Sequence, residues 1–303
     1  MKRRFVTLDV FTQHRFSGNQ LAIVLDGAGL NTVQMQAIAS EFNLSETVFL
    51  STPNDENVRA HLRIFTPLSE LSFAGHPTIG TAVLIAMHDL DGKKGKREFN
   101  LNCAIGTIKC SAQILKAGVG RSRFCAPVLP THRGDAPSIE KIAQALGLEP
   151  VDIGYGSHSP SRYGVSGIFD FIPISTLDAL KRIKPIHHLF DQTFGERAHQ
   201  AVYVYTNEPQ DAGNHFHARM FAPQMGINED PATGSAAIAF AAVLQENEHF
   251  AQGQHHFVIE QGYEIGRPSQ INLTIDIEQD EAIQAIHLGG SAIVVSNGFI
   301  RTP

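Results

Sequence analysis

The sequence predicts an α+β protein made of two pseudo-symmetric, barrel-like halves, each a curled mixed sheet around one central apolar helix. Three observations lead to this fold class: a motif that occurs twice, strand-like segments on both sides of each copy, and an apolar helix after each copy. The two copies lie about 155 residues apart, so the repeat is an internal duplication and not an array of short repeats.

The repeated motif reads R-x-F-x-P, followed by [HD]-P-x-x-G-[ST]-A. In the first copy Arg63–Pro67 precedes His76–Ala82, and in the second Arg219–Pro223 precedes Asp230–Ala236. Two runs rich in β-branched and aromatic residues lie before each copy, and we expect each pair to form a β-hairpin. These runs are 47–50 and 58–65 in the first half, and 201–205 and 215–221 in the second.

An apolar run follows each motif, over Thr81–Met87 in the first half and Ser235–Leu244 in the second. Neither run has a polar face, which is typical of a helix buried on all sides. Strand-like sequence then returns over 99–114 and 257–275. A sheet that curls around a buried helix fits this order of elements.

A chain of 303 residues favours two domains of about 150 residues each. We expect the first half to cover residues 1–118, completed by a C-terminal strand at about 290–303. The second half is then expected to cover residues 119–289. The segment 116–162 is rich in Gly, Pro and Ser, so it is the predicted crossover, with one surface helix over 138–146 that ends at Gly147.

Composition excludes several classes of function. The net charge of -6 argues against a surface for nucleic acid or anionic membranes, because both need a basic excess. No apolar run reaches about 18 residues, so no membrane span is predicted. Three cysteines, Cys103, Cys110 and Cys125, form no C-x-x-C pair, which favours a reduced, cytoplasmic protein.

The two motif copies differ where the chemistry would lie. Asp230-Pro231 is typical of a helix N-cap, a structural interpretation of the aspartate. His76-Pro77 occupies the matching position, and histidine is a poor N-cap. A histidine and an aspartate at repeat-equivalent positions would form an acid/base pair, whereas the alternative is a buried, hydrogen-bonded histidine.

Helix N-termini at these two positions would bind anions through free backbone N–H groups and the helix dipole. The adjacent Gly75 and Gly234 allow a ligand close to the backbone, and Ser235 adds a hydroxyl donor. Such ends could hold a substrate carboxylate and stabilise an enolate-like charge, although the glycines could also serve only tight packing. Read alone, Glu46 is an exposed charge, and the loop that ends at Asn19 is a turn or a binding loop.

Several stretches together carry a resemblance to a known family. The chain resembles the phenazine-biosynthesis (PhzF-like) isomerases, which belong to the diaminopimelate epimerase-like superfamily. The matching stretches are Phe16–Ala22, Ser45–Phe49, Arg63–Pro67, Phe73–Gly80 and Phe221–Ala236.

The resemblance implies two barrel-like domains with the active site between them. It places the catalytic glutamate on Glu46 and the active-site histidine and aspartate on His76 and Asp230. Asn19, in the first matching stretch, is expected to bind substrate. The small substrate-binding residues fall on three positions, namely Gly75, Gly234 and Ser235.

Family members are usually homodimers without metal or organic cofactor, so we expect a homodimer with no cofactor and a small carboxylate-bearing substrate. The expected reaction is a proton shift in which Glu46 removes a proton and returns it elsewhere on the same skeleton. Two alternatives stay open, a metabolite-binding protein without catalysis and an epimerase or racemase. A two-thiol racemase is disfavoured because no cysteine lies near either helix start.

Overall fold

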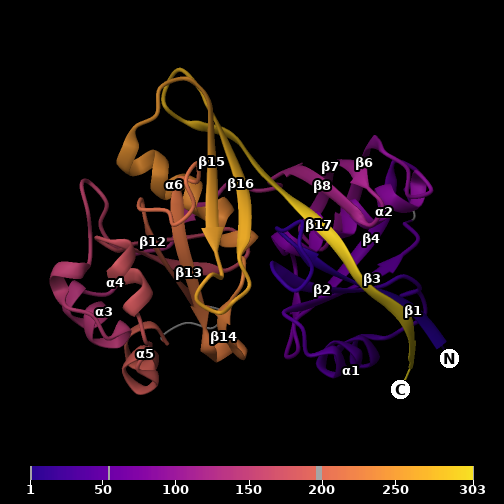
Figure 1. The fold of residues 1–303 in the computed structure, drawn as a ribbon, viewed down its shortest axis with the longest axis horizontal. Helices are drawn as coiled ribbons and strands as arrows, with labels where there is room; N and C mark the ends of the chain where they lie inside the picture. Colours follow the sequence, from indigo (N-terminus) through magenta and orange to yellow (C-terminus); the bar gives the residue numbers. More distant parts are fainter. Residues whose placement is uncertain (1, 54, 196–199, 303) are drawn as a thin grey trace. The chain divides into compact units, whose positions relative to one another are not determined.

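The computed structural model describes residues 2–53, 55–195 and 200–302, and its contacts divide the chain into two compact units. Unit 1 comprises Met1–Pro127 and His287–Pro303, and unit 2 comprises Val128–Ile286 (Figure 1). The predicted class, an α+β fold with barrel-like sheets around a central helix, is confirmed.

Eight described strands of unit 1 pair in a closed ring, so the sheet forms a barrel. The pairs β2–β3 and β4–β6 are parallel, and the other neighbours in the ring are antiparallel. A short strand, β5 (Glu70–Leu71), adds to β4. The ring order is β17 (Ile283–Arg301), β1 (Lys2–Val10), β2 (Asn19–Val24), β3 (Glu46–Ser51), β4 (Val58–Phe65), β6 (Gly95–Cys103), β7 (Gly106–Lys116) and β8 (Val119–Cys125).

The barrel of unit 1 is filled by α2 (Gly75–Asp89), which packs against six of its strands. All residues of this helix from Gly75 to Val83 are buried, as the apolar sequence predicts. Close packing needs a glycine at Gly80, because a Cβ there would lie 2.6 Å from Cδ2 of Leu21. Each buried branched apolar side chain of such a core contributes roughly 2 kcal/mol.

A second helix of unit 1, α1 (Thr32–Phe42), covers part of the outer face of the barrel. Asn31 caps its N-terminus through a capping box with Gln34. Met35, Ile38 and Ala39 form the buried face, and they belong to one apolar cluster with side chains of β2, β3 and β4.

Strand β8 also belongs to unit 1, because it pairs with β7 and with residues His287–Ile293 of β17. Residues 119–127, expected at the start of the second half, therefore lie in unit 1. The predicted crossover 116–162 contains the link between the units at residues 127 and 128. It also contains α3 (Ile139–Leu146), which ends at Gly147 in the left-handed conformation, as predicted.

The strands of unit 2 pair in the order β9, β10, β11, β12, β13, β15, β16, with β14 added to β13. The pairs β11–β12 and β13–β15 are parallel, as are the pairs at the matching places of unit 1. The strand bounds are β9 (Thr131–His132), β10 (Ser161–Gly164), β11 (Ile168–Pro173), β12 (Gln200–Thr206), β13 (Phe216–Ala222), β14 (Ile227–Asp230), β15 (Gly253–Gln261) and β16 (Ser269–Ile277).

The central helix of unit 2 is α6 (Gly234–Glu248), which packs against β10, β11 and β16. It matches the predicted apolar helix and is buried over most of its length. Three further helices, α3, α4 (Leu177–Arg182) and α5 (His187–Phe194), supply a separate apolar cluster with β11 and β12 (Figure 1). In the described part of the chain no helix is long and apolar enough to cross a membrane.

Candidate functional site

Folding of unit 1 brings Glu46 and His76 together. Glu46 is the first residue of β3, and His76 is the second residue of α2. The carboxylate atom Oε2 of Glu46 lies 3.1 Å from Nε2 of His76, with side chains that are 12% and 4% exposed. Read alone, Glu46 would be an exposed charge; instead it lies inside the fold beside an imidazole.

Burial controls the charge of His76. It lowers the pKa of the imidazole to about 3, and a hydrogen bond with the main chain of Gln20 opposes this only in part. The ring is therefore neutral near pH 7, and the contact with Glu46 is not a pair of full charges at that pH. A neutral imidazole carries one N–H. The two atoms are close enough for a proton to pass between the carboxyl group and the ring, an arrangement that suits acid–base chemistry.

Two more predicted site residues lie in the elements that carry this pair. Asn19 is fully buried at the start of β2, one residue before Gln20. Gly75 is the buried first residue of α2, directly before His76. Leu21, which follows Gln20 in β2, pairs in register with Glu46 of β3. The predicted residues of unit 1 thus lie on adjoining strands and the helix start.

The interpretation of Asp230 as a helix N-cap is wrong. It ends β14 and does not cap α6, which begins at Gly234 with Thr233 as its N-cap residue. The Thr233 hydroxyl donates to Oδ2 of Asp230 at 2.6 Å. The bonded carboxylate therefore belongs to a strand residue that lies four residues before the first residue of α6. The Asp-Pro sequence does not mark the first turn of this helix.

Gln261 links Asp230 to the start of α6. Its amide nitrogen donates to the main-chain carbonyl of Asp230 at 2.8 Å and lies 3.0 Å from Oγ1 of Thr233, and its amide oxygen accepts from the Thr233 N–H. Asp230 and Gln261 are both buried. The main-chain N–H of the N-cap residue Thr233 is therefore satisfied by a side chain of β15, 28 residues further along the chain.

Gly234 and Ser235 are the first two residues of α6, and Gly234 is buried whereas Ser235 is half-buried. Together with Asp230 they belong to unit 2, and the residues around Glu46 belong to unit 1. The sequence patterns did not indicate Gln20, Thr233 or Gln261 as site residues. Thr233 lies inside the repeated motif, so the motif itself was the available signal, but nothing in the sequence marks the other two.

Metal and thiol chemistry find little support in the residues present. Across residues 2–53, 55–195 and 200–302 no group of three or more His, Cys, Asp and Glu side chains could hold a metal ion. The three cysteines are free thiols in β6, β7 and β8. Burial raises the pKa of Cys110 to about 12 and also raises that of Cys103, which disfavours thiolates.

The fold occurs in solved structures of known enzymes. A hydroxyproline epimerase from Agrobacterium vitis has the same fold, with a TM-score of 0.67 over 99% of this chain and 91% of that chain at 11% identity. A PhzF-family protein from Bacillus anthracis matches more closely, with a TM-score of 0.86, 25% identity and 99% of each chain covered. The fold is thus that of the epimerase-like enzymes.

The family model described as phenazine biosynthesis-like protein matches residues 8–298, and the chain belongs to this family. An uncharacterized isomerase from Mesorhizobium japonicum is 38% identical over 98% of both chains. Trans-2,3-dihydro-3-hydroxyanthranilate isomerase from Pseudomonas aeruginosa is 31% identical and covers 97% of this chain and 98% of its own length. The predicted resemblance and the isomerase class of the enzyme are confirmed.

Proposed function

We propose that this isomerase moves a proton between two positions of a small carboxylate-bearing metabolite, with Glu46 as the general acid and base and without a cofactor. The observation that carries the proposal is the 3.1 Å contact between Glu46 and a buried His76 that stays neutral. An ionised carboxylate beside a neutral imidazole can accept a proton from carbon, and the carboxylic acid that results can return it to another carbon without passing it to bulk water.

In this proposal His76 orients Glu46 and shares its proton, while Asp230 binds a polar group of the substrate. The starts of α2 and α6, at Gly75 and at Gly234 with Ser235, are assigned to the substrate carboxylate and to the charge that develops on the substrate. Asn19 is assigned as a further substrate contact.

The Pseudomonas aeruginosa relative suggests the first substrate to test. Its name assigns it trans-2,3-dihydro-3-hydroxyanthranilate, a carboxylate with a C–H that can be acidified, and we propose a compound of this class for the present chain. The chain should convert it in heavy water and incorporate deuterium from the solvent into the product. Binding without turnover and without deuterium incorporation, across a panel of such acids, would instead indicate a metabolite-binding protein.

Two further features belong to the proposal. A reduced compartment such as the cytoplasm suits the three free thiols. A homodimer is expected from the resemblance, and sedimentation equilibrium tests it by the mass in solution. An epimerase would differ by returning the proton to the carbon from which it came, so the position of deuterium in the product separates the two reactions.

A further inference from the structure

Unit 1 has a cavity at the end of the barrel away from the Glu46–His76 pair. Its volume is about 400 Å³, within the range of small-molecule sites. Leu50 lines it from the far end of β3, four residues after Glu46, and Leu84 lines it from the C-terminal half of α2. At about 3.3 Å per strand residue and 1.5 Å per helix residue, the cavity lies roughly 12 Å from the pair.

The inner wall of the cavity is apolar. Ile85 and Ala60 are buried behind it, and Leu25, Leu50 and Leu84 are only half-buried, so they present apolar surface to the cavity. Half-buried leucines from a loop, a strand and a helix that converge on one hollow are an unusual feature of a well-packed barrel end. The wall suits a compact apolar group.

Two guanidinium groups lie at the rim of the cavity, Arg4 from β1 and Arg59 from β4. Each is paired through Nε and Nη2 with one carboxylate, Arg4 with Asp26 at 3.2 Å and Arg59 with Asp89 at 3.2 and 2.7 Å. The guanidinium donors of Nη1 are not used in these pairs. Because exposed ion pairs contribute little stability, a bound anion could take over part of this pairing at low cost.

The charges of the lining favour an anion. Arg4 and Arg59 both line the cavity, whereas of their two partners only Asp26 does so. His88, on the last turn of α2, also lies at the rim, with its Nδ1 3.5 Å from Oδ1 of Asp89. A site with an apolar wall and a rim of planar, bidentate donors is suited to a carboxylate on an apolar body.

We propose that this cavity, bounded by the ends of β1–β4 and the C-terminal half of α2, binds a small apolar carboxylic acid. The apolar body packs on Leu25, Leu50 and Leu84, and the carboxylate accepts hydrogen bonds from Arg4 and Arg59. This site is distinct from the proposed catalytic residues and does not depend on their role.

The absence of tryptophan from the sequence allows a direct test. Ala28 lines the cavity and is exposed, so Ala28→Trp places the protein's sole tryptophan at its rim, where excitation at the red edge of its absorption avoids the tyrosines. The probe is 4-tert-butylbenzoate, and 4-tert-butylbenzamide is its neutral counterpart. The matched control is Val151→Trp in unit 2, at a position that is 83% exposed.

The acid should shift the emission of the Ala28→Trp protein saturably and leave that of the Val151→Trp protein unchanged. The amide should bind at least about tenfold more weakly, since it lacks the charge. Adding Arg59→Gln should weaken binding of the acid about fivefold or more, whereas adding Arg97→Gln, an exposed arginine outside the cavity, should not.

Calorimetry with the same acid provides a second measurement that needs no reporter. The protein without a tryptophan should bind the acid, and Arg59→Gln should reduce the affinity by the same factor. Equal affinity for the acid and the amide, no change in Arg59→Gln, or no saturable signal in either measurement would overturn the proposal.

Discussion

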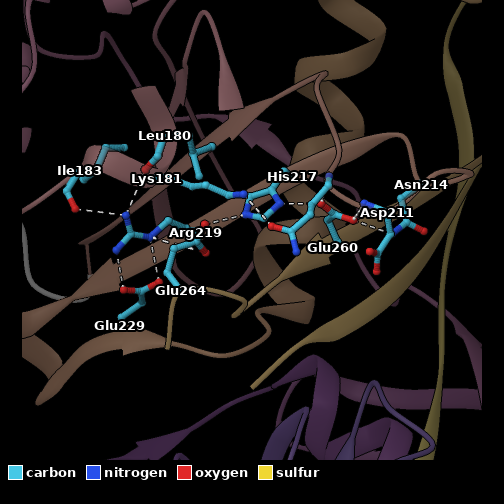
Figure 2. A network of polar contacts seen from close by, with 11 residues as sticks. Leu180, Lys181, Ile183, Asp211, Asn214, His217, Arg219, Glu229, Glu260 and Glu264 are labelled. Carbon is cyan, nitrogen blue, oxygen red and sulfur yellow. Dashed lines mark hydrogen bonds and ion pairs between the residues drawn. The ribbon is translucent and has the colours of Figure 1, made fainter. Parts of the chain in front are cut away.

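His217 and Glu260 face each other across the neighbouring strands β13 and β15, with Nδ1 of the imidazole 2.5 Å from Oε1 of the carboxylate. Both side chains are fully buried. The other ring nitrogen of His217 lies 2.9 Å from Oε1 of Glu264, so one imidazole joins two carboxylates (Figure 2). Because both ring nitrogens face acceptors, this geometry favours the protonated ring.

The contacts of His217 with Glu260 and Glu264 make the stability of unit 2 depend on pH. Burial alone would lower the pKa of His217, but Glu260 and Glu264 raise it above its usual value. The stabilisation is therefore complete below the unfolded pKa of about 6.5 and is lost as pH rises through the higher folded pKa. His217→Gln should cost about 3 kcal/mol at pH 6 and less at alkaline pH. Urea unfolding of the wild type and the variant at pH 6 and at alkaline pH measures this cost. An equal cost at both pH values would contradict a protonated His217.

The repeat provides a matched pair of arginines. Arg219 is buried and bound to Glu229 at 2.9 and 2.8 Å and to the main-chain carbonyls of Leu180 and Ile183 (Figure 2). Its equivalent, Arg63, is bound to Glu70 with side chains 27% and 36% exposed. Arg219→Met should therefore destabilise the protein by about 3 kcal/mol, because it leaves a buried carboxylate without its partner.

Arg63→Met serves as the control and should cost about 1 kcal/mol or less, since water can solvate Glu70. Both values come from denaturant unfolding monitored by circular dichroism. If the two substitutions cost the same, burial does not set the strength of these pairs.

His76 should remain neutral over a wide pH range. Burial lowers its pKa to about 3, so its ring signals in long-range ¹H–¹⁵N spectra should not move between pH 8 and pH 5, whereas free imidazole in the same buffer does. The unfolded chain takes up this proton near pH 6.5, so stability should fall as pH drops below that value. A titration of the His76 signals centred near pH 6.5 would show that the ring can be charged in the folded protein.

The cysteines should be dispensable. Burial raises the pKa of both Cys103 and Cys110, and Cys125 lies in β8, outside the first turns of α2 and α6. Replacement of all three by serine or alanine, whichever folds, should leave the isomerisation rate within about twofold, because a thiolate pair is not available as acid and base. Loss of turnover in a folded variant would favour a thiol mechanism.

The fold was largely predictable because the hydrophobic pattern is strong where burial is complete. The runs that became α2 and α6 have no polar face, and a helix of this composition is expected to be buried on all sides. The hairpins β3–β4 and β12–β13 followed from their alternating, β-branched sequence and are confirmed. The helix α1 was missed because half of its residues are polar and only Met35, Ile38 and Ala39 are buried.

The site was less predictable because its contacts are long-range. Glu46 and His76 are thirty residues apart in the sequence, and only the parallel β2–β3 pair and the closure of the barrel bring them within 3.1 Å. The bond of Gln261 to Asp230 crosses from β15 to β14, and no spacing rule indicates it. The importance of His217 could have been predicted from the repeat. When the motif is extended by two residues towards the N-terminus, both copies contain a histidine, in His61-Leu-Arg63 and in His217-Ala-Arg219.

The central claim is that Glu46 carries the proton, and turnover by Glu46→Gln tests it most directly. General acid–base catalysis by one residue contributes about 10²–10⁴-fold. In heavy water, Glu46→Gln should bind the dihydro-hydroxyanthranilate that we propose as substrate with nearly unchanged affinity, keep its unfolding midpoint, and lose product formation and deuterium incorporation by about that factor. Deuterium incorporation at the wild-type rate by a folded Glu46→Gln protein would contradict the account.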